Sequence, residues 1–122
     1  MLFLSSVCLY SCYRDNKAAL YPKSSVPGSS SCDTTNTSYS GAVQPVFSKN
    51  CALSGCHASA SPTGGYVLDT YKGAISIVLS GRLIGAITHS AGYSVMPKNA
   101  AMLSDCDIAL ITSWINQGAQ NN

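Results

Sequence analysis

Cys51-Ala52-Leu53-Ser54-Gly55-Cys56-His57 is the most informative segment of this sequence. Two cysteines followed at once by a histidine are what covalent haem attachment needs, because each thiol can add across one vinyl group and the adjacent imidazole can reach the iron. The common spacing leaves two residues between the cysteines, whereas four stand here. The extra residues must therefore bulge from the loop, with the flexible Gly55 among them. A zinc ligand set or a plain disulfide would use the same residue types.

Composition excludes some classes of function. The 122 residues contain seven Lys and Arg and five acidic residues, all of them Asp, for a formal net charge of +2. Nucleic-acid binding by counterion release requires a clustered basic surface, so no nucleic-acid partner is expected. Six cysteines in so short a chain point to an oxidising compartment, a metal or a covalent cofactor. A small domain also buries little apolar surface and commonly needs such a cross-link or prosthetic group.

The N-terminal residues 1–12, MLFLSSVCLYSC, have the pattern of an export signal. This apolar segment is too short to span a bilayer but has the length of the hydrophobic part of a secretory signal. Its end, Leu9-Tyr10-Ser11-Cys12, resembles the lipobox of bacterial lipoproteins. We therefore expect an exported protein in the periplasm or cell envelope, anchored to a membrane by a lipid on Cys12. A frayed apolar N-terminus is the alternative, because no basic residue precedes Arg14.

Residues 13–39 have the composition of a flexible tether. They are rich in Ser, Thr, Pro and Gly and lack a sustained apolar period, which is typical of segments that do not build a packed core. The folded domain is accordingly expected over residues 40–122.

Two helical patterns occur in the first half of this domain. Residues 43–50 place their apolar side chains on one face, and Pro45 is tolerable there in a first helical turn. Residues 70–81 have Thr70 as a capping residue and a glycine behind them. Helix is the favoured interpretation of this second segment, although its apolar run at residues 75–79 would also suit a strand.

The last helical pattern, at residues 104–118, is the clearest. Ser104 and Asp107 form a capping box, an apolar stripe follows, and Gly118 ends it. No alternating run in the chain demands a sheet. The sequence therefore predicts an all-α domain with long loops.

A methionine further along the chain could bind the open face of a haem iron. Met96 lies 39 residues after His57 and just before the capped C-terminal helix. Pro97 follows it and stiffens the loop, because proline fixes φ and lacks an amide N–H, and a weak thioether ligand needs such a loop. His89 is the alternative sixth ligand, and Met102 is a weaker competitor because it adjoins the final helix.

The order of these landmarks resembles that of small bacterial class I cytochromes c. A short helix, the Cys-Cys-His run, variable loops, a Met-Pro pair and a last helix carrying Trp114 follow one another over roughly residues 40–119. The resemblance implies a small helical bundle wrapped around one covalent haem c. It also implies that the first and last helices cross in contact, where Phe47 and Trp114 would form an aromatic pair.

The same resemblance assigns roles to individual residues. Cys51 and Cys56 would attach the haem, and His57 and Met96 would be its axial ligands. Arg82 resembles a partner for a haem propionate.

Two cysteines, Cys32 and Cys106, remain after the others have been assigned. Cys8 would leave with the signal, Cys12 would be acylated and the next two cysteines would hold haem, so these two would pair in an oxidising compartment. In the family the first and last helices are in contact. Cys32 precedes the first helix of this chain, and Cys106 lies at the start of the last helix. The resemblance thus makes a disulfide plausible, with two separate buried thiols as the alternative.

No catalytic constellation is present in the sequence. The chain has no Glu, Asp107 serves as a cap, and neither histidine has a free nucleophile beside it. We therefore expect no enzyme and no small-molecule substrate, but an electron carrier that meets redox partner proteins transiently. Two other classes stay open: an exported zinc- or copper-binding module that uses Cys51, Cys56, His57 and His89, and a structural lipoprotein with a Cys51–Cys56 disulfide.

Overall fold

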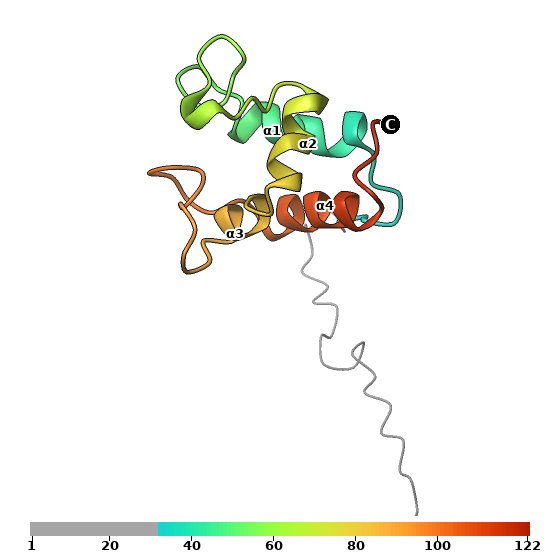
Figure 1. Ribbon diagram of the computed structural model, residues 1–122. Helices are drawn as coiled ribbons and strands as arrows, with labels where there is room; N and C mark the ends of the chain where they lie inside the picture. The colour runs from blue at the N-terminus through green and yellow to red at the C-terminus, as the bar shows by residue number, and fades with distance from the viewer. Residues whose placement is uncertain (1–31) are drawn as a thin grey trace, which may run out of the picture. The chain divides into compact units, whose positions relative to one another are not determined.

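Helices are the regular secondary structure of residues 32–122, which are the residues that the computed structural model describes (Figure 1). In chain order the elements are a π-helical turn Tyr39–Val43, α1 Gln44–Asn50, a 3-10 turn Thr63–Gly65, α2 Tyr71–Leu79, α3 Leu83–Ile87 and α4 Asp105–Asn116. No β-strand occurs within residues 32–122. The all-α class predicted from the sequence is confirmed for this part of the chain.

Three of the helical segments begin at a hydroxyl side chain that caps the first turn. Ser38, Thr70 and Ser104 each accept a hydrogen bond from the backbone N–H three residues later, before Tyr39–Val43, α2 and α4 respectively. Such a bond satisfies one of the amides that a helix leaves free at its start. The helix starts predicted after Thr70 and Ser104 are confirmed, and residues 75–79 are helical rather than extended.

The start of α2 packs against the backbone that precedes it. A Cβ atom added to Gly73 would lie 1.7 Å from the carbonyl oxygen of Val67, far inside van der Waals contact. Glycine at this position therefore allows the helix to approach the preceding segment.

Aromatic side chains from distant parts of the chain meet in the core. The Trp114 ring centroid lies 5.5 Å from that of Tyr39 and 6.4 Å from that of Tyr71. Phe47 is buried in the same core but does not provide these ring contacts, so the pairing expected from the family is replaced by two tyrosines. The buried apolar residues are Tyr39, Val43, Val46, Phe47, Leu68, Ala74, Ile77, Leu83, Ile87, Leu103, Ile111, Trp114 and Ala119.

Packed residues also occur just before residue 40. Thr37 and Tyr39 are each 3% exposed. Ser38 caps the helical turn Tyr39–Val43, and the Thr37 hydroxyl donates to the Thr34 carbonyl at 3.3 Å. The expected signal at residues 1–12, the anchor Cys12 and the rest of the tether lie outside the described residues.

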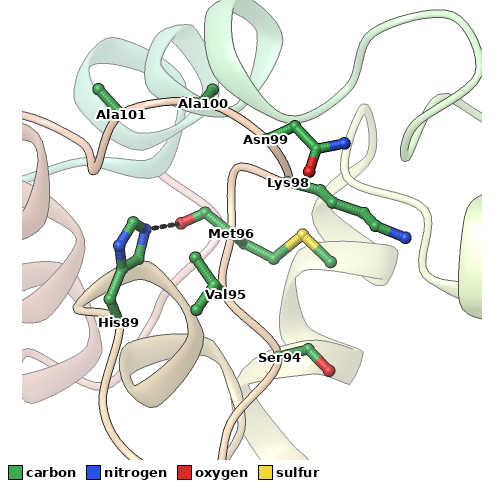
Figure 2. Close-up of a pocket in the computed structure, with 8 residues that line it drawn as sticks. All are labelled: His89, Ser94, Val95, Met96, Lys98, Asn99, Ala100 and Ala101. Carbon is green, nitrogen blue, oxygen red and sulfur yellow. Dashed lines mark hydrogen bonds between the residues drawn. The ribbon is translucent and has the colours of Figure 1, made fainter.

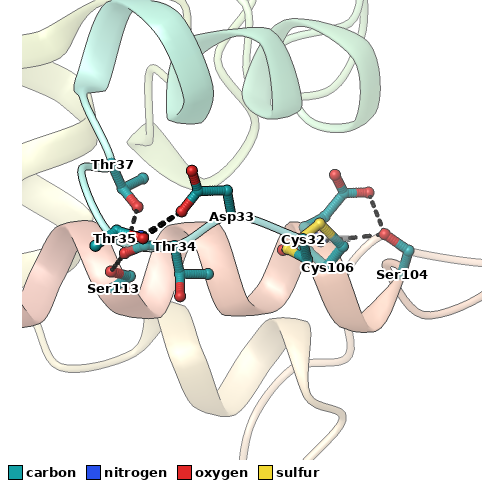
Figure 3. The surroundings of a disulfide bond; sticks show 9 residues. Cys32, Asp33, Thr34, Thr35, Thr37, Ser104, Cys106 and Ser113 are labelled. Atoms are coloured by element: carbon teal, nitrogen blue, oxygen red, sulfur yellow. Dashed lines mark hydrogen bonds between the residues drawn. A yellow bond between two sulfur atoms is a disulfide. The ribbon is translucent and has the colours of Figure 1, made fainter. Parts of the chain in front are cut away.

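A disulfide joins the start of the described segment to its last helix. Cys32 and Cys106 are bonded, with their Cα atoms 5.5 Å apart, which confirms the implied pairing. Figure 3 shows the segment after Cys32 lying along α4, where the Thr34 carbonyl accepts hydrogen bonds from Ser113 Oγ at 2.8 Å and Gln117 Nε2 at 3.3 Å. The covalent bond and these hydrogen bonds hold residues 32–37 against the helix.

Two long loops leave the helices on the same side of the view in Figure 1. Residues 51–70, drawn largely in green, connect α1 to α2, and residues 88–104, drawn in orange, connect α3 to α4. The residues expected to hold haem, Arg82 excepted, lie on these two loops or where α1 ends. None of the helices within residues 32–122 combines the length and the apolar character needed to cross a bilayer.

Candidate functional site

A tight turn takes up the extra residues between the two cysteines. The Cys56 N–H donates to the Leu53 carbonyl at 2.9 Å, and Gly55 has a φ of +76°, a conformation that favours glycine. A Cβ atom on Gly55 would have no neighbour within 4 Å, and the Leu53 side chain is 45% exposed. Residues 53–55 thus form the bulge that the four-residue spacing requires.

The bulge returns the chain to the end of α1. The His57 N–H donates to the Cys51 carbonyl at 3.1 Å, and the Cys51 N–H donates to the Phe47 carbonyl at 2.8 Å. Cys51 is half-buried, Cys56 is exposed, and both are free thiols rather than a disulfide. The loop therefore returns the backbone of His57 to the C-terminus of α1 in spite of the long spacing.

The two thiols differ in their surroundings. Burial raises the pKa of the Cys51 thiol to about 11, and the charge of a nearby Cys56 thiolate contributes in the same direction. Cys51 is therefore protonated at neutral pH and available as an S–H group.

The His57 ring is oriented by a backbone carbonyl. Its Nδ1 lies 3.2 Å from the Tyr66 carbonyl oxygen. A carbonyl only accepts hydrogen bonds, so Nδ1 carries the hydrogen and Nε2 keeps its lone pair in the neutral ring. A second bond, from the Leu68 N–H to the His57 carbonyl at 2.8 Å, fixes the backbone of the same residue. This arrangement is the one by which proteins orient a histidine that ligates a metal through its other nitrogen.

Further hydrogen bonds hold the loop between His57 and α2. Thr63 donates its N–H to the Cys56 carbonyl at 2.6 Å and its hydroxyl to the Gly55 carbonyl at 3.0 Å. The Ser59 N–H donates to the Asp69 carboxylate at 2.8 Å, and this bond lowers the pKa of Asp69. The loop thus has its own internal scaffold.

The second loop carries Met96 and borders a cavity of about 710 Å³. Met96 is half-buried, and Figure 2 shows its thioether directed away from the His89 ring. That volume lies within the range of sites for cofactors and other small molecules. The cavity is lined by His89, Ser94, Val95, Met96, Lys98, Asn99, Ala100 and Ala101.

The structure does not place all the predicted residues around one cavity. Cys51, Cys56 and His57 lie on the first loop, and they and Arg82 are outside the lining of the cavity beside Met96. Arg82 is exposed at the start of α3 and forms no ion pair within the described residues. Within residues 32–122 no three His, Cys, Asp or Glu side chains gather as a metal-binding group.

Exposed apolar side chains on both loops suit a large apolar group. Leu53 on the first loop is 45% exposed, and Tyr93 and Val95 on the second are 44% and 46% exposed. Together with an imidazole whose Nε2 is free, two free thiols and a thioether, they provide the donors and the apolar surface that haem requires. These are the residue types that would hold a covalent haem, and they lie on two separate loops.

Sequence reasoning missed two contributors to this site. The Tyr66 carbonyl that orients His57 is a backbone group, and no side-chain pattern could have identified it. His89 was considered as a ligand, but its Nε2 lies 3.1 Å from the carbonyl oxygen of Met96. Only the fold of the loop reveals this contact between His89 and the Met96 carbonyl.

No protein-family model, curated protein or solved structure matches the chain. Its function is therefore inferred from its own residues and their geometry.

Proposed function

We propose that this protein is an electron-transfer c-type cytochrome that carries one covalent haem c. The observation that supports this proposal best is the His57 ring, which gives its Nδ1 hydrogen to the Tyr66 carbonyl and keeps Nε2 free. His57 directly follows Cys56, and its N–H donates to the Cys51 carbonyl. Histidine ligands of metals are oriented in this way. The adjoining thiols add the chemistry specific to haem attachment.

Attachment would use the two thiols as S–H groups. Each would add across one vinyl double bond, with the sulfur bonded to one carbon and the hydrogen to the other. The raised pKa of Cys51 keeps it protonated before this reaction. The exposed turn at residues 53–55 lets Cys56 adjust its position without disturbing α1, because this turn makes no core contact.

Two residues would complete the coordination. His57 Nε2 and the Met96 thioether would hold the iron, and Arg82 would neutralise a propionate from the exposed start of α3. Bound haem supplies reversible one-electron chemistry, and a thioether ligand favours the ferrous state. Apolar residues such as Val95 would exclude water from the surroundings of the haem.

Charge indicates how the protein would meet its partners. Residues 32–122 contain four basic residues (Lys49, Lys72, Arg82, Lys98) and four Asp, so their formal charge is zero before any propionates are counted. Strong electrostatic steering requires a large surface charge of one sign. Docking to redox partner proteins would accordingly be weak and transient.

The proposal includes export and membrane attachment through Cys12. Cys32–Cys106 pairing supports an oxidising compartment, because disulfides persist there and are rare in reducing ones. No substrate, nucleic acid or enzymatic reaction is part of this function.

The test is a visible spectrum of protein matured in an exporting host, followed by acid-acetone extraction. A Soret band that stays with the polypeptide is expected, and the variant with Cys51→Ala and Cys56→Ala should lose the covalent link. The variant with Cys32→Ala and Cys106→Ala is the matched control and should retain it. A colourless protein, or haem that extracts freely from the wild type, would refute the proposal, and stoichiometric zinc or copper in colourless protein would favour the metal-binding alternative.

A further inference from the structure

We infer that His89 is a positioning residue that holds Met96 in place as the distal ligand, an inference that rests on the proposed haem site. His89 Nε2 lies 3.1 Å from the Met96 carbonyl oxygen, and Figure 2 shows this contact beside the cavity. Because a carbonyl can only accept, Nε2 carries the hydrogen and donates it. The ring nitrogen in this bond is therefore committed to the backbone of Met96.

Both backbone groups of Met96 are held by the end of α3. Its N–H donates to the Ala86 carbonyl at 3.1 Å, and its carbonyl accepts from His89. The His89 N–H also lies 3.3 Å from the same Ala86 carbonyl. The Ala86 carbonyl thus binds the N–H groups of both His89 and Met96, and the His89 imidazole binds the Met96 carbonyl.

The backbone of His89 is in a conformation that side chains rarely adopt. Its φ is +53°, in the left-handed region, and a non-glycine residue there marks a local constraint that surrounding contacts must maintain. The reversal of the chain at this residue leads from the α3 terminus into the loop that returns as Met96. The positive φ of His89 and its hydrogen bond to the Met96 carbonyl together point to a positioning role.

The side chains of His89 and Met96 take different directions. In Figure 2 the imidazole lies on one side of the Met96 backbone and the thioether points to the other. For His89 to become the sixth ligand through Nε2, it would have to release the Met96 carbonyl. Among the described residues no other hydrogen bond to that carbonyl is formed, so the release would leave the group without its partner.

A matched pair of variants tests this role. His89→Gln keeps a hydrogen-bond donor of similar reach, and His89→Leu removes the donor. Both variants place a non-glycine residue at the same positive φ, so they differ in the donor rather than in this backbone constraint. Ferric haem-loaded protein would be titrated with imidazole, which competes with the thioether for iron, and the sulfur-to-iron charge-transfer band would be recorded. Global unfolding of both variants by denaturant shows whether a change is confined to the Met96 loop.

Loss of the donor should weaken thioether ligation. We expect His89→Leu to bind imidazole roughly 2- to 10-fold more tightly than wild type, the range that corresponds to one ordinary hydrogen bond, with a diminished charge-transfer band. His89→Gln should stay near wild type. Equal imidazole affinity and an unchanged band in His89→Leu would overturn the inference, as would a bis-histidine spectrum in the wild type that collapses in both variants. Failure of the proposed function is distinct, because the wild type would then hold no covalent haem.

Discussion

Removal of the Cys32–Cys106 disulfide should destabilise the folded unit by about 4.5 kcal/mol. The two cysteines are separated by 74 positions, and closing a loop of that length removes chain entropy from the unfolded state worth about 4.5 kcal/mol at 25 °C on the loop-entropy model. The hydrogen bonds of the Thr34 carbonyl to Ser113 and Gln117 do not involve either sulfur atom and should remain in the variant. The segment should therefore keep its place on α4, and the fold should survive with a lower unfolding free energy.

The assay is guanidinium unfolding of the haem-loaded protein, followed by far-UV circular dichroism. Wild type would be compared with the variant carrying Cys32→Ser and Cys106→Ser, with and without a thiol reductant. Reductant should lower the wild-type midpoint to that of the variant and leave the variant unchanged. In a domain of this size a loss of about 4.5 kcal/mol corresponds to a fall in Tm of roughly 20–35 °C. A loss below about 1 kcal/mol, or two titratable thiols from Cys32 and Cys106 in denatured unreduced protein, would refute the reasoning.

Two further predictions concern the backbone at α2 and the thiol at the end of α1. Gly73→Ala should lower the unfolding free energy by about 2–3 kcal/mol or more, because its Cβ would collide with the Val67 carbonyl. The control Ser76→Ala, on the exposed face of α2, should change the unfolding free energy by less than about 0.5 kcal/mol. Equal unfolding curves for the two variants would contradict the packing argument. In chain produced without haem, alkylation of Cys51 should keep accelerating about tenfold per pH unit up to its pKa of about 11. Mass spectrometry of the alkylated peptide measures this, and a rate that levels off below pH 10 would be inconsistent with the buried thiol.

Local chemistry explains which helices were predictable. Thr70 and Ser104 are capping hydroxyls placed directly before apolar runs, and both helices start after them. The third helix, Leu83–Ile87, was not predicted because its five residues are too few to display a helical period and include a glycine.

The segment just before residue 40 has structure that its composition does not indicate. Ser38 and its neighbours have tether composition, yet Ser38 caps a helical turn and Tyr39 enters the aromatic core with Trp114. Composition reports the average behaviour of such segments, whereas the disulfide at Cys32 supplies the constraint that orders this one.

The sequence identifies the residue types of the candidate site, but it does not specify how the loops arrange them. The bulge at Gly55 follows directly from the count of residues between the cysteines and is present. The bond that orients His57 and the bond from His89 to Met96 both involve backbone carbonyls. Those partners depend on how the loops fold, and residue identities alone do not specify them.

Mass spectrometry of the mature protein tests the central claim most directly. The intact mass should exceed that of the polypeptide, with any lipid on Cys12 counted, by one haem, and the added mass should remain on the proteolytic peptide that contains residues 51–57. The peptides with Cys32 and Cys106 should be linked to each other and carry no haem. An unmodified 51–57 peptide in which Cys51 and Cys56 titrate as free thiols, or are joined as a disulfide, would contradict the proposed cytochrome.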